Sequence, residues 1–297
     1  QTLQLRPAPE AGGRLRDARM SAGDHPGLLP MEAALERLLA LADASRIDES
    51  EPVSLADADG RILAEPLIAT LDLPPWPNSA MDGYALRLAD WSGQPLPVSQ
   101  RIQAGNAPLP LQPGSCARIF TGAPLPEGAD TVEMQENIEL DEAGCVYFRE
   151  PLSIGQNVRA QGQETRVGEC VLPAGTRLGP IELGLAASLG AAQLGVRRRL
   201  CVAVLSTGDE LVEPGQALGP GQIYNSNRRL LIAWLQRLGC SVVDAGILPD
   251  DLQRTRAALG ALGEVDLILS TGGVSVGEAD YLGLALREAG ELALWKL

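Results

Sequence analysis

The stretch Cys201-Val-Ala-Val-Leu-Ser206 decides the fold of the last third of the chain. Its continuous apolar run, closed by polar residues, is typical of a strand buried on both faces of a sheet. Three similar stretches follow, at residues 241–247, 265–270 and 291–296. Apolar residues recur with a helical period between them, at residues 226–238, 252–262 and 278–289. Strands that alternate with helices across short connections predict a doubly wound parallel α/β sheet.

The sequence before this sheet differs in character from one region to the next. An apolar stripe from Met31 to Leu39 predicts a helix that follows Pro30 and ends near Asp43, and an acidic loop at 48–51 comes next. Residues 53–64 are expected to form a helix or turn and then a strand. We predict four regions: a disordered segment at 1–26, a linker domain at 27–65 and 166–197, an inserted β-rich domain at 66–165, and a partial α/β domain at 198–297.

The overall composition excludes several classes of protein. The net charge of −14 argues against a general nucleic-acid binder, which usually carries a basic face. No apolar run approaches the ~18 residues of a membrane helix, and the first residues do not resemble a secretory signal. Five cysteines without a CxxC pair argue against a zinc site or a disulfide framework and favour the cytoplasm. The only histidine, His25, leaves no basis for Ser-His-Asp catalysis.

Small and acidic residues occupy the loops that follow the predicted strands, where ligands bind in such sheets. The loops are Ser206-Thr-Gly-Asp-Glu210, Pro249-Asp-Asp251, and Ser270-Thr-Gly-Gly273 continuing to Gly277-Glu-Ala-Asp280. Hydroxyls and backbone amides can hold an oxyanion, whereas the neighbouring carboxylates would repel it unless a divalent cation lies between them. These loops therefore predict an anionic, phosphate-bearing ligand together with Mg²⁺.

Each acid in these loops also has a purely structural explanation. Asp250, Asp251, Glu278 and Asp280 stand where they could cap helices or serve as first-turn acids. Lys296 is the only lysine, and either an arginine-rich genome or a functional point charge could account for it. Neither the Walker A pattern nor GxGxxG is present, so the usual nucleotide motifs give no support.

Four longer motifs carry a specific resemblance. They are Pro77-Asn-Ser-Ala-Met-Asp-Gly-Tyr-Ala85, Arg118-Ile-Phe-Thr-Gly-Ala-Pro-Leu-Pro126, Ser206-Thr-Gly-Asp-Glu-Leu211 and Ser270-Thr-Gly-Gly-Val-Ser-Val-Gly-Glu-Ala-Asp-Tyr281. Together they resemble the molybdopterin molybdenumtransferase family, the MoeA type, whose animal relative is gephyrin. The resemblance runs from about residue 27 to the last residue and implies insertion of molybdate into adenylylated molybdopterin, with Mg²⁺ and release of AMP. It also implies a cytosolic homodimer.

The resemblance further implies roles for individual residues. Glu210, Asp250 and Asp280 would act in catalysis and hold the metal, and Asp82 and Thr121 of the inserted domain would approach the α/β domain of the other subunit. Asp82 and Thr121 could equally be plain turn residues. Substrate would contact the small, hydroxyl and lysine residues of the same loops: Ser206, Thr207, Gly208, Ser270, Gly272, Gly273, Ser275 and Lys296.

The sequence departs from the family at two places. It stops at Leu297, before a basic loop and a terminal barrel that the family carries, so we expect a C-terminally truncated chain. Gln163 stands where the family has an acid. Alternatives are a molybdopterin-binding scaffold, an inactive fragment and a molybdopterin adenylyltransferase, the last disfavoured by the inserted region. Expected partners are a second copy, that adenylyltransferase and recipient molybdoenzymes.

Overall fold

The computed structural model describes residues 30–149, 151–272 and 281–289. The chain divides into two compact units, one of them Pro52–Gly195 and the other formed by residues up to Glu51 together with those from Val196 onward. None of the helices in the described ranges is both long and apolar enough to cross a membrane. The predictions for residues 1–26 and for the strand at 291–296 concern parts of the chain outside these ranges.

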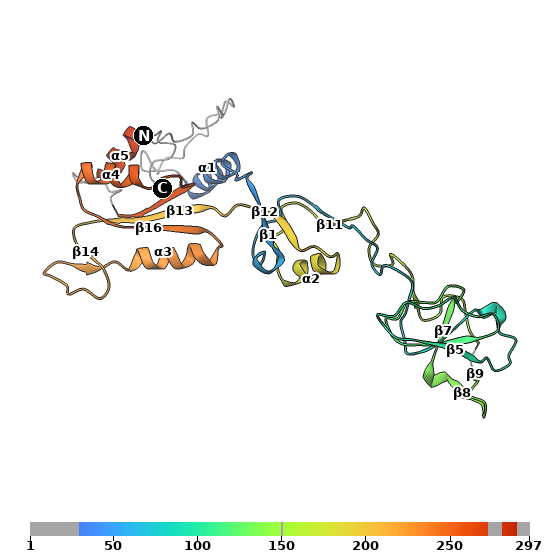
Figure 1. The fold of residues 1–297 in the computed structure, drawn as a ribbon. Coiled ribbons are helices and arrows are strands. Elements are labelled where there is room, and N and C mark those ends of the chain that lie inside the picture. The colour runs from blue at the N-terminus through green and yellow to red at the C-terminus, as the bar shows by residue number, and fades with distance from the viewer. Residues whose placement is uncertain (1–29, 150, 273–280, 290–297) are drawn as a thin grey trace. The chain divides into compact units, whose positions relative to one another are not determined.

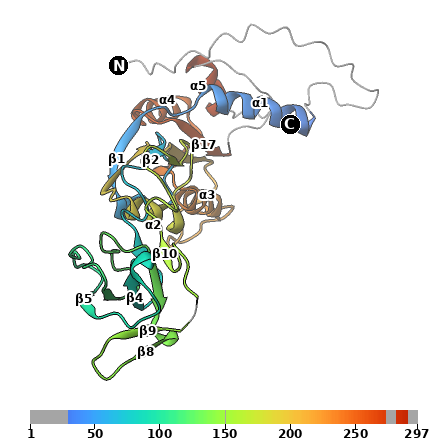
Figure 2. The same cartoon turned by 90° about the vertical axis from the view of Figure 1, so that its right-hand side faces the viewer.

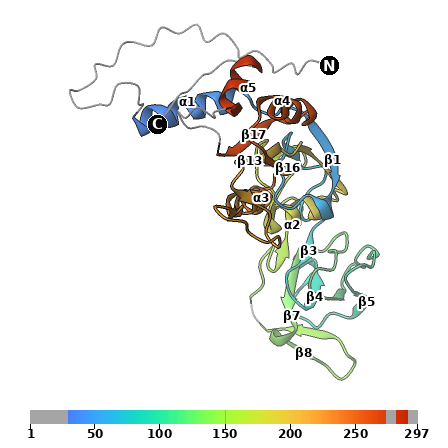
Figure 3. The same ribbon diagram turned by 90° about the vertical axis from the view of Figure 1, so that its left-hand side faces the viewer.

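A three-stranded parallel sheet forms the centre of the second of these units. Its strands are β13 (Cys201–Thr207), β16 (Ser241–Leu248) and β17 (Leu267–Thr271), in the order β16-β13-β17. Because β13 has a neighbour on each side, its residues from Val202 onward are buried. The parallel sheet predicted from the alternating pattern is confirmed, and Figure 3 shows the three strands together.

Helices cover both faces of this sheet. They are α3 (Ser226–Arg237), α4 (Leu252–Ala261) and α5 (Tyr281–Ala289). Successive side chains of β13 point to opposite faces, so Val204 packs with Leu235 of α3, whereas Leu205 packs with Leu259 of α4 and Leu282 of α5. Figure 1 shows α3 on one side of the strands and α4 with α5 on the other, which confirms the doubly wound arrangement.

The connection from β13 to α3 contains a small structure of its own. Strands β14 (Leu211–Val212) and β15 (Ile223–Tyr224) pair in parallel within it. Helix α1 (Met31–Ala44) belongs to the same unit, and it begins directly after Pro30 as predicted. Its only buried residue is Ala34, so the predicted apolar stripe is exposed in the described part of the chain.

The unit Pro52–Gly195 contains a four-stranded sheet with the order β5-β6-β4-β7. The strands are β4 (Gly83–Leu86), β5 (Val98–Ile102), β6 (Cys116–Ile119) and β7 (Thr131–Met134). Ala85, Ala117 and Val132 form a core on one face, and Leu86 and Cys116 pack on the other. The hairpin of β8 (Ile138–Leu140) and β9 (Val146–Phe148) contributes Val146 and Phe148 to the core on that second face. Figure 2 shows the hairpin at one end of this unit.

Short strand pairs join segments that are distant in the sequence. The pairs are β1 (Ser50–Ser54) with β12 (Gln193–Arg197), β2 (Leu67–Ile68) with β11 (Cys170–Leu172), and β3 (Asn78–Ser79) with β10 (Val158–Arg159). Helix α2 (Pro180–Ser188) precedes β12. The predicted acidic loop at 48–51 is partly wrong, because pairing with β12 makes Ser50 and Glu51 the start of a strand. After β1 come only a 3₁₀ turn at Leu55–Asp57 and an isolated bridge at Ile62, so the predicted strand there is not formed.

Candidate active site

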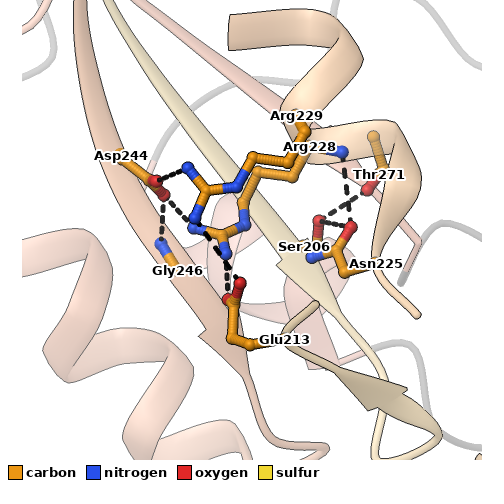
Figure 4. Close-up of polar contacts among 8 residues, drawn as sticks. All are labelled: Ser206, Glu213, Asn225, Arg228, Arg229, Asp244, Gly246 and Thr271. Atoms are coloured by element: carbon orange, nitrogen blue, oxygen red, sulfur yellow. Dashed lines mark hydrogen bonds and ion pairs between the residues drawn. The ribbon is translucent and has the colours of Figure 1, made fainter. Parts of the chain in front are cut away.

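The carboxyl end of β13 brings hydroxyl groups of two neighbouring strands together. Ser206 Oγ lies 2.7 Å from Thr271 Oγ1 on β17 and donates a longer hydrogen bond, 3.4 Å, to Asn225 Oδ1 (Figure 4). Ser206 is buried on the α3 side of the sheet, and Thr207, the next residue, points to the opposite face. The predicted site residues Ser206 and Thr207 therefore face different layers of the same sheet edge.

Two buried polar atoms at this edge are left without a partner. Asn225 caps α3, because its Oδ1 accepts the amide of Arg228 at 3.3 Å, but its Nδ2 has no hydrogen-bond partner among the described residues. Thr207 Oγ1 likewise has none. Buried polar atoms normally find a partner, so unused hydrogen-bonding capacity marks this strand end. The burial of Asn225 beside Ser206 could not be predicted from the sequence, because the two residues belong to different elements.

Two predicted site glycines have backbone angles that favour glycine, and at Gly272 the chain also approaches too closely for a side chain. At Gly272, with φ +92°, a Cβ atom would lie 2.5 Å from the carbonyl oxygen of Thr207. At Gly208, with φ +141°, it would lie 2.3 Å from Oε2 of Glu210. The Glu210 carboxylate therefore lies against the Gly208 backbone, and Ser270 Oγ donates to the Gly272 carbonyl at 3.3 Å.

The acidic residues after β13 and β16 divide into structural and free groups. Asp251 Oδ1 accepts the amide of Arg254 at 2.7 Å and caps α4, so the capping explanation holds for Asp251. The amide of Asp250 donates to Asp209 Oδ1 at 3.2 Å, which ties the two loops together. The exposed carboxylates of Glu210 and Asp250 take part in no ion pair or hydrogen bond with the described residues.

Glu210 and Asp250 offer carboxylate oxygens, the ligand type that Mg²⁺ prefers. Mg²⁺ is commonly held by one or two carboxylates, with substrate phosphate and water completing its shell. Within the described ranges no group of three or more His, Cys, Asp or Glu residues is placed to hold a metal ion by itself. Four predicted site residues lie outside the described residues: Gly273, Ser275, Asp280 and Lys296.

A buried arginine that was not predicted stands beside this edge. Arg228 of α3 pairs with Glu213, which follows β14, and with Asp244 of β16 (Figure 4). Its side chain is only 4% exposed, and its Nε is unpartnered among the described residues. Arg229 lies farther from the same two acids, at 3.5 and 3.7 Å. Helical spacing places Arg228, and not Arg229, on the same face of α3 as Leu231 and Leu235. Its acidic partners could not be predicted, because they come from distant elements.

The other unit brings its two predicted site residues into direct contact. Thr121 donates its amide at 2.7 Å and its hydroxyl at 2.8 Å to the same oxygen, Asp82 Oδ1. These two bonds lower the pKa of Asp82, the amide contributing most, with a smaller contribution from the charge of Arg118. Asp82 is therefore held as an ionised carboxylate at the start of β4, and Thr121 follows β6.

Comparison with known proteins places most of the chain in one family. Residues 29–190 match the MoeA N-terminal region (domain I and II), and residues 203–297 match a probable molybdopterin binding domain. The chain belongs to the MoeA family of molybdopterin molybdenumtransferases. The family assignment made from the four motifs is confirmed, as is the expected fold class of α/β and β-rich parts.

MoeA-type relatives resemble the chain over most of its length. The molybdopterin molybdenumtransferase of Haemophilus influenzae is 43% identical over 252 residues, covering 84% of this chain and 62% of the relative. That of Synechococcus elongatus is 39% identical, with 89% and 68% covered. The crystal structure of the molybdopterin biosynthesis MoeA protein from Pyrococcus horikoshii superposes with a TM-score of 0.77 at 33% identity, covering 90% of this chain and 68% of that one. The chain thus spans about three fifths of the H. influenzae relative.

Proposed function

We propose that this MoeA-family chain acts in molybdenum cofactor biosynthesis by inserting molybdate into adenylylated molybdopterin, with release of AMP. The observation that carries the proposal is the convergence of hydroxyls, close-packed glycines and free carboxylates at one sheet edge. Relatives at 39–43% identity are named molybdopterin molybdenumtransferase. No observation favours a scaffold or an adenylyltransferase.

The small and hydroxyl residues of this edge form the proposed substrate subsite. Ser206, Thr207, Gly208, Ser270 and Gly272 would contact the anionic substrate through hydroxyls and backbone amides, as anion sites at strand ends do. Thr207 Oγ1 and Asn225 Nδ2 are supporting observations, because each is a buried polar atom with capacity to spare. Gly273, Ser275 and Lys296 belong to the same proposed subsite.

The acids form the proposed metal-binding group. Glu210, Asp250 and Asp280 would hold Mg²⁺, which when bound would offset the negative charge of the substrate's pyrophosphate. Glu210 is already brought over the Gly208 backbone, and Asp250 is held by the bond of its amide to Asp209. Each of these two acids therefore belongs to a loop that is held by a contact with a neighbouring residue.

Asp82 and Thr121 complete the proposed catalytic set from a second copy of the chain. The paired hydrogen bonds of Thr121 keep the Asp82 carboxylate ionised and in one orientation, as a group that orients a reactant requires. We place the homodimer in the cytoplasm, with the adenylyltransferase and recipient molybdoenzymes as further partners. The division into a linker, an inserted and an α/β domain is part of this proposal.

The deciding experiment measures AMP release from adenylylated molybdopterin and Mg²⁺, with and without molybdate, using the 297-residue chain. Molybdate-dependent release supports the proposal, and consumption of ATP would support an adenylyltransferase instead. Asp250→Asn should abolish release, whereas Glu264→Gln should not, because Glu264 is an exposed acid of the same unit that precedes β17 and so lies at the opposite end of that strand from the site. Equal release by both variants would contradict the site. If the unsubstituted chain releases no AMP, the proposal that this chain is active is wrong.

A further inference from the structure

A row of four side chains crosses the sheet of the Pro52–Gly195 unit next to the Asp82 turn. Arg101 of β5 stands opposite Arg118 of β6, which stands opposite Tyr84 of β4, which in turn stands opposite Glu133 of β7. These residues share one face of the sheet because they are paired in register. Phe120 lies two residues after Arg118 along the chain, next to this row.

Both arginines stack on the same aromatic ring. The guanidinium carbon of Arg101 lies 4.7 Å from the centre of the Phe120 ring, and that of Arg118 lies 4.6 Å from it. Arg118 also lies 5.0 Å from the Tyr84 ring. Two aromatic contacts restrict the rotamers of the Arg118 side chain, so its guanidinium is held in one place before it forms any hydrogen bond.

Arg118 uses that fixed guanidinium to join the two chain segments around Asp82. Its Nη1 donates to the carbonyl of Gly83 at 2.9 Å, and its Nη2 donates to Gln135 Oε1 at 2.5 Å. The amide of Gln135 donates in turn to the carbonyl of Asp82 at 3.1 Å. Arg118 therefore contacts the residue after Asp82 and the residue that binds the Asp82 backbone.

The remaining freedom of this turn is small. A Cβ atom on Gly83 would lie 1.9 Å from the Glu133 carbonyl oxygen, so β4 and β7 are in close backbone contact where Asp82 leaves the sheet. On the other side, Thr121 follows β6 and donates two hydrogen bonds to the Asp82 carboxylate. Arg118 lies on β6 itself and connects this strand to both sides of the turn.

We propose that Arg118 is a positioning residue for Asp82: by bonding Gly83 and Gln135 it holds the turn so that the Asp82 carboxylate meets the amide and hydroxyl of Thr121. The positive charge of Arg118 adds to this, because it favours ionised Asp82. The importance of Arg118 for turnover rests on the proposed function, whereas the effect of Arg118 on the position of Asp82 does not.

Arg101 provides a matched control. It stacks on the same ring at almost the same distance and carries the same charge, but its side chain donates no hydrogen bond to any residue in the described ranges. A general effect of losing an arginine from the sheet would therefore appear in Arg101→Met and Arg118→Met alike. An effect of positioning would appear only in Arg118→Met.

The first test measures the pKa of the Asp82 carboxyl group and the hydrogen-exchange rate of the Thr121 amide by NMR in the 297-residue chain. Arg118→Met should raise this pKa and speed the exchange at least about tenfold, the equivalent of about 1.4 kcal/mol, and Arg101→Met should leave both near the unsubstituted values. Arg118→Lys keeps the charge but loses the paired donors, so the Thr121 amide should also exchange faster in this variant. Equal values in the Arg101 and Arg118 variants would overturn the proposal. If Arg118→Met does not fold, Arg118→Lys decides.

The second test measures molybdate-dependent AMP release by the same variants. Arg118→Met should lower kcat roughly tenfold to a hundredfold with little change in KM, as expected for a misplaced reacting group, and Arg101→Met should retain kcat. If the unsubstituted chain releases no AMP, the proposed function is rejected. The NMR measurements would still test whether Arg118 positions Asp82. An unchanged kcat in Arg118→Met would reject its catalytic importance.

Discussion

At the scale of single residues, the contact between Thr121 and Asp82 joins positions 39 residues apart. We predict that Thr121→Val, which removes the hydroxyl bond and keeps the amide bond, raises the pKa of Asp82 toward its ordinary value of 3.8. Because the folded-state pKa is lowered, ionised Asp82 stabilises the fold above about pH 3.8, and this contribution is lost as the pH falls through the folded-state value.

An NMR titration of the Asp82 carboxyl group checks this prediction. Thr176→Val serves as the control, because the Thr176 hydroxyl donates to the carbonyl of Pro173 at 2.7 Å and does not contact Asp82. An Asp82 pKa that is the same in both variants would mean that the Thr121 hydroxyl bond is not formed in solution.

At the scale of elements, the turn after β17 depends on the absence of a side chain at Gly272. We predict that Gly272→Ala destabilises the fold by roughly 2 kcal/mol or more, because it combines a left-handed backbone with a clash against the Thr207 carbonyl. Gly263→Ala, with φ +68° and open space around its Cβ position, should cost only about 1 kcal/mol. Urea unfolding measures both variants, and equal losses would show that the close approach of β13 and the turn is not maintained.

The buried arginine of α3 is a second element-scale feature, because it ties the helix to β16 and to the β14 loop. Arg228→Met should destabilise the fold by roughly 2 kcal/mol or more, since it leaves Glu213 and Asp244 without their buried partner. Arg229→Met removes a longer, solvent-exposed pair to the same acids and should cost less than about 1 kcal/mol. Thermal unfolding of the two variants compares them directly, and the reverse order would contradict the assigned pairing.

At the scale of the whole molecule, the apolar stripe of α1 bears on the proposed homodimer. Leu35, Leu38 and Leu39 are 48–58% exposed in the described part of the chain, although such stripes are normally covered. We predict that the chain is a dimer in solution and that Leu35→Lys with Leu39→Lys makes it a monomer. Ile181→Lys, at an exposed position of α2, should leave the dimer intact. Light scattering after size-exclusion chromatography measures the mass, and a monomeric unsubstituted chain, or a dimeric double variant, would contradict this use of α1.

Much of the fold could be predicted because its signals are local. Continuous apolar runs and helical periods marked β13, β16 and β17 with α3 and α4, to within a residue or two at most ends. The prediction was wrong around residues 48–64, where no local pattern shows that Ser50 and Glu51, at the end of an acidic stretch, pair with β12. Strand formation there depends on a partner more than 140 residues away.

The sequence by itself determined the α/β alternation, the β-rich region and the family, because short-range periodicity and long motifs are properties of the chain alone. Only the tertiary structure decided that β13 lies between β16 and β17, that Asp251 caps a helix while Asp250 does not, and that Arg228 pairs with Glu213 and Asp244. It also decided that Arg118 joins Gly83 to Gln135. Each of these depends on which distant groups meet, and a contact between distant groups is set by packing rather than by the neighbours of either residue in the sequence.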